Sequence, residues 1–416
     1  MIRIGIVGCG RILAAHLRGY RLLREAGVED FRITAMCSRK AADAWGYVKR
    51  DGGHPQRRAV SDIPGDPLGT GDEFLSDFQD TDDVEVFTDF RELIARGKID
   101  AVNDFTTHGL HHVVGQCAID HGKHLLSQKP LAVTIRAARR MVDSADKSEI
   151  TFGVFENARQ RLLARQWRWA FRSGPLGNPQ MALLGNVGTW WAPNRIVAQT
   201  PWRHKIVEGG GISLDLGVHQ FDVIRQVCGE IRSVTARTSV TEKKRFTFGE
   251  SGDAIDEMDC DADDTFYASF ETENGVTGTL FGSWSGAGTN TVLGNGPTFY
   301  GTKGRVSGNQ IHIEGEADAQ SVAALYATQA ANEIKEANQP FGLENEFAIA
   351  QHDWLDAIRR GTQPETDGRE GLIDLACAYA IVESARAGRE VLVEDVLEGR
   401  VEEYQKPINE HFKIES

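Results

Sequence analysis

Three ionisable side chains follow a glycine-rich segment near the middle of the chain. Gly209-Gly210-Gly211 precedes Asp215, His219 and Asp222, which are spaced i, i+4 and i+7. On one continuous helix these positions share a face, so the spacing predicts a polar stripe. An Asp one turn before a His orients the imidazole and raises its basicity, as a proton-transferring residue needs near neutral pH. The alternative is a helix whose polar side chains are merely satisfied.

A lysine follows a short apolar segment in the first third of the chain. Gln128, Lys129 and Pro130 come directly after residues 124–126, which read as a strand. Ligands of open parallel sheets bind at the carboxyl ends of the strands. A lysine there can polarise an oxygen on a carbon that exchanges hydride, or relay its proton. A surface lysine before a proline turn is the plain alternative.

A glycine-rich turn lies between the first predicted strand and the first predicted helix. Gly8-Cys9-Gly10-Arg11-Ile12-Leu13 follows the apolar run 4–7 and opens a helix. Two glycines let the backbone approach a pyrophosphate, which is stabilised by the free amides of the helix N-terminus. Leu13 stands where a small third residue is usual, so the motif predicts a dinucleotide site mainly through its strand–turn–helix context. A purely structural turn is the alternative.

The end of the second predicted strand bears on the choice of cofactor. An Asp or Glu that would bind a free ribose 2′-hydroxyl is missing, and Ser38 and Arg39 stand there instead. A hydroxyl beside a guanidinium suits a 2′-phosphate, so we expect NAD(P)(H) with a leaning to NADP(H). Alternatively, Arg39 stacks on the adenine and NAD(H) remains usable.

Two domains must position these residues. Alternating strands and helices in residues 1–158 predict a Rossmann dinucleotide-binding domain with a six-stranded parallel sheet. Residues 159–416 contain many strand-like runs joined by short turns, followed by two helices, which predicts an α+β domain with a largely antiparallel open sheet for substrate binding and oligomerisation. Segments 46–84 and 241–263 read as inserted loops of solvated surface. The expected fold class is α/β.

Composition narrows the class of protein. The net charge of -14 disfavours nucleic acid and anionic lipid as partners, because both attract an excess of Lys and Arg. The six cysteines show no zinc-ligand spacing, so no metal is expected. With neither a signal peptide nor a long apolar stretch in view, we expect a cytoplasmic protein.

An ordered set of motifs resembles the Gfo/Idh/MocA family of oxidoreductases along nearly the whole chain. The motifs, in chain order, are Gly8-x-Gly10, Thr106-Thr107-His108-Gly109-Leu110-His111, Gln128-Lys129-Pro130, Glu156-Asn157-Ala158-Arg159, Trp202-Arg203 and the segment 209–219. Gln128 stands where Glu is usual in the family, and Thr107 where Pro is usual. The first change removes a negative charge beside Lys129.

The resemblance implies functions for individual residues. It implies a catalytic trio of Lys129, Asp215 and His219, in which His219 is the favoured base, Lys129 polarises the reacting oxygen and Asp215 orients its neighbours. Which of Lys129 and His219 takes the proton stays open. The expected cofactor contacts are Gly8, Gly10, Arg11, Ile12, Ser38, Arg39, Thr106, His108, His111, Gln128 and Lys129. The expected substrate contacts are Lys129, Asn157, Arg159, Trp202, Arg203, Asp215 and His219.

Aromatic residues point to the class of substrate. Trp190, Trp191, Trp202 and Trp284 flank the glycine-rich segment or end predicted strands. Flat rings bind the C–H face of sugars, while polar neighbours such as Asp222 and His111 read the hydroxyls. The alternative is that the tryptophans pack a sheet or a subunit interface.

Together these features predict an NAD(P)-dependent sugar, inositol or polyol dehydrogenase or reductase. Two other functions stay open. One is a glycosidase or C-glycoside-processing enzyme that uses NAD transiently on the same fold, and the other is a non-catalytic nucleotide-binding regulator. By analogy with the family we expect a homodimer or homotetramer.

Overall fold

The computed structural model describes the 416-residue chain except for residues 62–65, 189–190, 250, 287–290, 293–295 and 416. Trp190 and parts of both predicted insertions therefore lie outside the described residues. The chain divides into two compact units, each built from two segments. The first unit comprises Met1–Asn157 and Pro340–Leu372, and the second comprises Ala158–Gln339 and Ile373–Ser416.

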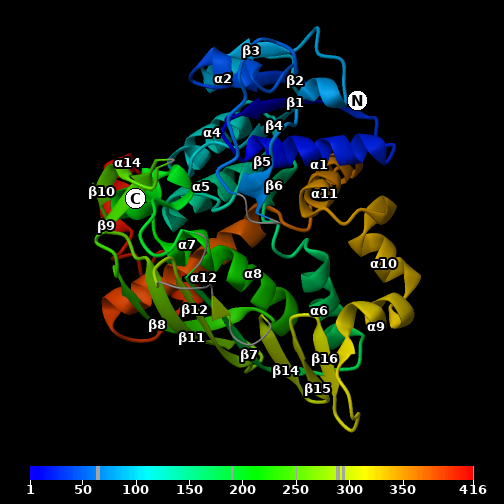
Figure 1. The fold of residues 1–416 in the computed structure, drawn as a ribbon, viewed down its shortest axis with the longest axis vertical. Coiled ribbons are helices and arrows are strands. Elements are labelled where there is room, and N and C mark those ends of the chain that lie inside the picture. Colours follow the sequence, from blue (N-terminus) through cyan, green and yellow to red (C-terminus); the bar gives the residue numbers. More distant parts are fainter. Residues whose placement is uncertain (62–65, 189–190, 250, 287–290, 293–295, 416) are drawn as a thin grey trace. The chain divides into compact units, whose positions relative to one another are not determined.

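The first unit is built on a six-stranded sheet in the order β3-β2-β1-β4-β5-β6 (Figure 1). Every neighbouring pair in this sheet is parallel. The strands are β1 (Ile2–Val7), β2 (Phe31–Cys37), β3 (Glu85–Phe87), β4 (Ala101–Asp104), β5 (His124–Gln128) and β6 (Phe152–Phe155). The strand order reverses between β1 and β4, so this is a Rossmann sheet whose ligand site is expected at the carboxyl ends of those two strands.

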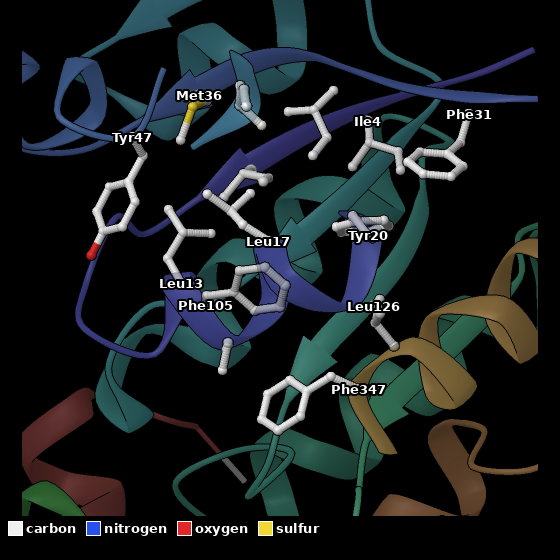
Figure 2. Close-up of a cluster of buried hydrophobic side chains, with 14 of the residues drawn as sticks. Ile4, Leu13, Leu17, Tyr20, Phe31, Met36, Tyr47, Phe105, Leu126 and Phe347 are labelled. Carbon is white, nitrogen blue, oxygen red and sulfur yellow. The ribbon is translucent and has the colours of Figure 1, made fainter. Parts of the chain in front are cut away.

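Helices connect the strands of the first unit. They are α1 (Leu13–Glu25), α2 (Ala41–Trp45), α3 (Phe90–Arg96), α4 (His108–Asp120), α5 (Ile135–Ala145) and α11 (Glu346–Arg360), with the 3-10 turns η1 (Pro67–Gly69), η2 (Leu75–Asp77) and η6 (Pro340–Gly342). Helix α1 turns Leu13, Leu17 and Tyr20 toward β1 and β2, because residues spaced by three or four share a helix face (Figure 2). Each such side chain contributes roughly 1.5–3 kcal/mol when fully buried.

Segment 340–372 is where the structure differs from the predicted division into 1–158 and 159–416. Helix α11 packs along α1 in the first unit. Gly19 permits this close approach, since a Cβ there would lie 2.4 Å from the side-chain oxygen of Gln351 and 3.1 Å from the backbone nitrogen of Ala348. The contact depends on residues more than 300 positions apart, which local periodicity cannot reveal.

The predicted insertion 46–84 also contributes to the core of the first unit. Tyr47 and Leu75 are 1% and 0% exposed, and both belong to the cluster drawn in part in Figure 2. The description of this whole segment as solvated surface was therefore wrong for these residues. Its Asp-, Gly- and Pro-rich composition concealed buried apolar side chains, of which Tyr47 reaches the first βα turn.

The second unit contains a ten-stranded sheet in the order β17-β16-β15-β14-β7-β12-β11-β8-β18, with β13 paired to β7. Its strands are β7 (Pro179–Val187), β8 (Ile231–Ser239), β11 (Thr265–Thr272), β12 (Thr277–Ser283), β13 (Thr291–Val292), β14 (Thr298–Gly301), β15 (Gly304–Ser307), β16 (Gln310–Ile313), β17 (Gln320–Ser321) and β18 (Val391–Leu392). Strands β7 and β12 pair in parallel, and the other pairs are antiparallel. The predicted largely antiparallel sheet is confirmed.

A separate hairpin and several helices complete the second unit. The hairpin pairs β9 (Lys244–Phe248) with β10 (Ala254–Asp259), within the predicted insertion 241–263. The helices are α6 (Leu162–Arg172), α7 (Ile212–Asp215), α8 (Gly217–Cys228), α9 (Val322–Gln329), α10 (Asn332–Asn338), α12 (Gly368–Ala387, which begins in the first unit), α13 (Val393–Leu397) and α14 (Lys406–Phe412), with the 3-10 turns η3 (Val197–Gln199), η4 (Pro201–His204) and η5 (Ile206–Glu208).

Strand β11 shows that the two faces of the large sheet differ. Phe266, Ala268 and Phe270 are buried, whereas the alternate residue Tyr267 is 57% exposed. Because successive side chains of a strand point to opposite faces, one face packs into the core and the other is open in the single chain. Within the described residues, we find no helix that combines the length and the apolar character needed to cross a membrane.

Candidate active site

The turn after β1 has the geometry of a dinucleotide-binding loop. Gly8 adopts a φ of +101°, and a Cβ at this position would lie 2.5 Å from the carbonyl carbon and oxygen of Phe105, directly after β4. A Cβ at Gly10 would have no other heavy atom within 4 Å, apart from its chain neighbours. The first glycine thus permits close contact with β4, and the second leaves backbone open to a ligand. Helix α1 begins at Leu13, which brings free amides to the same place.

The departure from the glycine motif at position 13 has a structural explanation. Leu13 is fully buried and packs in the core cluster. Tyr47 supports the loop from outside the motif, since its hydroxyl donates to the carbonyl oxygen of Gly10 over 2.9 Å. Of the predicted loop contacts, Gly10, Arg11 and Ile12 are partly exposed. The turn therefore fits a diphosphate despite its unusual third residue.

Positive charge gathers beside this loop. Burial, and next the nearby positive charge of Arg57, lower the pKa of the Arg11 guanidinium. At the end of β2, Ser38 is half-buried and Arg39 is exposed. Like charges held close together favour an anion between or beside them. Arg11, Ser38 and Arg39 are compatible with a phosphate group, whereas Arg57 already pairs with Asp43 over 2.8 Å.

The histidines after β4 lie inside the protein. His108 Nε2 lies 2.8 Å from the carbonyl oxygen of Ala132, and His111 Nδ1 lies 2.7 Å from that of Pro130. Both residues are at most 2% exposed. The family resemblance implies that both contact the cofactor, and His111 was also expected to read hydroxyls. In the structure both rings bond to backbone carbonyls of the segment after Lys129, which ties α4 to that segment.

Thr106 is held by the residue that ends β4. Its backbone amide and hydroxyl donate to Asp104 Oδ1 over 2.9 and 2.6 Å. Asp104 is fully buried, and this desolvation raises its pKa despite the opposing effects of His111 and Thr106. The predicted contact Thr106 therefore lies in a turn with a fixed backbone at the ligand edge of the sheet.

Lys129 lies at the same edge of the sheet as the glycine loop. Strand β5, which ends at Gln128, is parallel to β4, and β4 is parallel to β1. Gln128 Oε1 accepts a hydrogen bond of 3.0 Å from the backbone nitrogen of Lys129, and Lys129 itself is half-buried. The Lys129–Pro130 peptide is cis. Asn157, a predicted substrate contact, follows β6 and is 7% exposed.

In the second unit, Trp202, Arg203 and Asp215 form one group. Arg203 Nε donates to Asp215 Oδ2 over 3.1 Å, and its guanidinium carbon lies 4.3 Å from the centre of the Trp202 ring. The Arg203 and Asp215 side chains are 19% and 20% exposed, so water reaches both. Three of the residues predicted to contact substrate are thus brought together at a solvent-accessible place.

Close packing of the glycine-rich segment explains its composition. A Cβ at Gly210 would lie 2.6 Å from the carbonyl oxygens of Trp202 and Arg203, and one at Gly211 would lie 2.3 Å from Asp263 Oδ1. Gly211 also adopts a φ of +117°. Glycine is therefore required for the backbone to pass between η4 and Asp263.

The predicted polar stripe is only partly present. Helix α7 ends at Asp215 and α8 begins at Gly217, so Asp215 lies on a different helix from His219 and Asp222. Gly217 lies close to α12. Asp215 and His219 are half-buried, whereas Asp222 is fully buried. The proposal that Asp222 reads substrate hydroxyls was wrong, because its carboxylate points into the protein.

Asp222 instead belongs to a buried ionic cluster. It accepts hydrogen bonds from the backbone nitrogen of Arg159, over 3.0 Å, and from the Arg159 guanidinium. Arg225 donates to Asp374 over 2.7 Å and to Glu230 over 2.7 and 3.2 Å. Arg159, which was expected to contact substrate, is 3% exposed, and its bonds to Asp222 hold α8 in place.

Of the other tryptophans that were expected to bind sugar, one is buried and one is partly exposed. Trp284 is 4% exposed and packs edge-on against His204, which makes it a core residue, while Trp191 is partly exposed. Over the described part of the chain, no group of three or more His, Cys, Asp or Glu side chains is placed to hold a metal ion.

Asp263 is a site-supporting residue that the sequence did not reveal. Its Oδ2 accepts from the backbone nitrogen and the hydroxyl of Ser213, over 3.0 and 2.7 Å. Burial raises the pKa of this carboxyl to about 6, although the Ser213 hydrogen bonds oppose the shift. An acidic residue before a strand gave no signal, since only folding brings it to the start of α7.

The raised pKa of Asp263 predicts a pH effect on stability. The folded state binds this proton more tightly than the unfolded state, so its contribution is full below about pH 4 and is lost as pH rises through about 6. In the wild type this loss lowers the free energy of unfolding by an amount on the order of 2 kcal/mol between these pH values, and we expect it to be absent in Asp263→Asn. Urea unfolding of both proteins from pH 4 to 8 measures this, and parallel pH profiles would contradict it.

Comparison with known proteins identifies the family. Residues 69–156 match the model described as an oxidoreductase family with an NAD-binding Rossmann fold, and residues 164–307 match the GFO/IDH/MocA C-terminal domain. The chain is 27% identical over 308 residues to 1,5-anhydro-D-fructose reductase of Ensifer adhaerens, covering 74% of this chain and 84% of the relative. It is 23% identical to myo-inositol 2-dehydrogenase of Thermotoga maritima, covering 95% of this chain and 100% of that protein.

Solved structures share the fold. A levoglucosan dehydrogenase in complex with NADH and L-sorbose superimposes with a TM-score of 0.73 at 20% identity, covering 94% of this chain and 99% of the other. An Agrobacterium radiobacter oxidoreductase in complex with NAD+, L-tartaric acid and magnesium gives a TM-score of 0.67 at 21% identity, covering 94% and 98%. The matched domains and the glycine-loop geometry agree: the chain belongs to the Gfo/Idh/MocA family of NAD-binding oxidoreductases.

Proposed function

We propose that this protein transfers hydride between NAD(P) and a hydroxyl-bearing carbon of a sugar, inositol or related polyol. The main support is the position of Lys129 at the end of β5, separated only by β4 from the glycine loop after β1. Relatives named for anhydrofructose, apiose, levoglucosan and inositol support a small carbohydrate or polyol substrate.

The proposed mechanism divides binding and proton transfer among named residues. Gly10 and the start of α1 would hold the diphosphate through backbone amides, while the amide of Gly8 donates to the carbonyl oxygen of Cys37 over 2.9 Å and fixes the turn. When bound, the nicotinamide supplies or accepts the hydride. Lys129 donates a hydrogen bond to the reacting oxygen, and His219 takes or returns the hydroxyl proton. Asp215, held by Arg203, orients polar groups of the second unit.

A substrate panel tests this proposal directly. We expect that oxidised NAD or NADP with at least one sugar, inositol or anhydrosugar gives a rise in absorbance of reduced nicotinamide. No change across a broad panel, in either direction, would count against the proposal. Product formation without net cofactor reduction would indicate a glycosidase that uses the dinucleotide transiently.

We propose Ser38 and Arg39 as the residues that favour NADP(H). Arg39→Ala is expected to weaken NADP(H) binding by roughly 10- to 100-fold, because a charge-assisted hydrogen bond is lost, with little effect on NAD(H). Fluorescence titration measures both dissociation constants. The matched control is Arg96→Ala. Arg96 is an exposed arginine at the C-terminal end of α3, near the amino ends of the strands and away from the ligand edge. An unchanged ratio of the two constants would refute the phosphate role.

We also propose a homo-oligomer, dimeric or tetrameric. The support is the open sheet face, on which Met181 is 43% exposed and Tyr267 stacks on Phe281 with ring centres 5.8 Å apart. Apolar side chains on a sheet face suit pairing with a second copy. Light scattering of the wild type and of Tyr267→Lys tests this, and a monomeric wild type would exclude it.

A further inference from the structure

The side chain of Gln128 connects two parts of the first unit. Its Oε1 accepts from the backbone nitrogen of Lys129 over 3.0 Å, and its Nε2 lies 3.0 Å from Nε2 of His16 on α1. His16 is fully buried and has no part in the proposed proton transfer. The bridge therefore joins the helix that follows the dinucleotide loop to the main chain of the proposed catalytic lysine.

The direction of these hydrogen bonds determines where the His16 proton lies. The Lys129 amide can only donate, so the Gln128 atom beside it must be the carbonyl oxygen. The amide NH2 of Gln128 then faces His16, whose Nε2 must accept and carry no proton. Burial lowers the pKa of His16 well below its ordinary value, which agrees with a neutral ring. The remaining proton is on Nδ1, which lies 3.5 Å from the amide nitrogen of Gln351, at the outer limit of a hydrogen bond. That amide donates to the nearer carbonyl oxygen of His16, over 3.0 Å.

Packing holds the His16 ring in this orientation. It stacks on Phe105 with ring centres 3.6 Å apart and an interplanar angle of 18°, and it meets Phe155 and Phe347 edge-on. Gln351 on α11 donates to the His16 carbonyl oxygen over 3.0 Å. Figure 2 shows Phe105 and Phe347 in this part of the core. Rotation of the imidazole would break these contacts, so Gln128 meets a fixed acceptor.

We propose that Gln128 is a positioning residue that couples the main chain of Lys129 to the Nδ1-protonated tautomer of His16. This inference rests on the proposed role of Lys129 in hydride transfer. Glutamate, the more usual residue in the matching motif, accepts from the Lys129 amide but cannot donate to His16. A Glu at this position therefore requires a proton on His16 Nε2, so residue 128 selects the tautomer.

Nitrogen NMR of full-length protein with 15N-labelled histidine tests the tautomer. The chain has 12 histidines, so loss of one signal pair in His16→Gln assigns His16. In the wild type we expect an unprotonated Nε2 and a protonated Nδ1. In Gln128→Glu we expect Nε2 to carry a proton. A protonated Nε2 in the wild type, or no change in Gln128→Glu, would overturn the inference, and neither reading depends on turnover.

Kinetics tests the positioning role. Gln128→Leu removes both hydrogen bonds and is expected to lower kcat/KM by roughly 10- to 100-fold, mainly through kcat, because the reacting group is displaced. Gln128→Glu keeps the bond to Lys129 and should retain more activity. The control Gln116→Leu alters a glutamine of α4 whose side chain donates to Asp120 over 2.8 Å, and it should match wild type. Wild-type activity in Gln128→Leu would overturn the positioning role. Absence of hydride transfer in the wild type would refute the proposed function and leave the NMR result standing.

Discussion

Replacing Lys129 by Met is expected to lower kcat/KM by about 10²- to 10⁴-fold. Methionine keeps the length of the side chain but removes the ammonium group that we propose holds the reacting oxygen. The dinucleotide dissociation constant should stay within a few-fold of wild type, since the glycine loop and α1 provide the diphosphate contacts. Steady-state kinetics with the best substrate of the panel, together with cofactor titration, separates the two effects.

The matched control for this experiment is Lys123→Met. Lys123 lies just before the same strand, β5, at its amino end, where its ammonium donates to the carbonyl oxygen of Ile99 over 2.8 Å. Ligands bind at the opposite edge, so this variant should keep its kcat/KM. Equal losses in both variants would show a general structural effect. Unchanged turnover in Lys129→Met would favour a nucleotide-binding regulator.

Replacing Asp222 by Ala is expected to destabilise the second unit by about 3–5 kcal/mol. The Asp222 side chain is fully buried and that of Arg159 is 3% exposed, so the change leaves a buried guanidinium without its closest counter-charge. Arg159 also lies 3.9 Å from Asp374, which limits the loss without replacing the direct hydrogen bonds. Urea unfolding, followed by tryptophan fluorescence, measures the effect.

Glu230→Gln provides the comparison at the outer end of the same cluster. The Glu230 side chain is 55% exposed and pairs over 2.7 Å with Arg225, which is 1% exposed. In Glu230→Gln the buried guanidinium keeps Asp374 at 2.7 Å as its counter-charge. We therefore expect a small shift in the urea midpoint, well below that of Asp222→Ala. Similar midpoints for the two variants would contradict the structural role of Asp222.

The sequence revealed the elements whose signals are local. The first βα turn, the six-stranded parallel sheet and the position of Lys129 after β5 follow from apolar runs, glycines and their order along the chain. The antiparallel character of the second sheet also follows from short strands joined by tight turns. In each case neighbouring residues determine the structure.

Features that depend on distant contacts could not be predicted. The inward direction of Asp222 depends on Arg159. The break between α7 and α8 brings Gly217 close to α12, where a Cβ on this glycine would lie 3.4 Å from the side chain of Ile381. The hydroxyl of Tyr47 reaches Gly10 from a segment whose composition indicates solvated surface. For the burial of His16 the sequence offers one weak indication, which is a polar residue on the apolar face of an amphipathic helix.

The return of segment 340–372 to the first unit affects how this protein can be made and shortened. During translation, α1 emerges more than 300 residues before its partner α11. Until then the apolar face of α1 lacks Phe347, Ala348 and Leu355, which complete the buried cluster. A truncated gene encoding 1–157 alone would leave that face uncovered and yield an aggregation-prone product. A fusion of 1–157 to 340–372 through a flexible linker would supply all six strands of the unit together with α11.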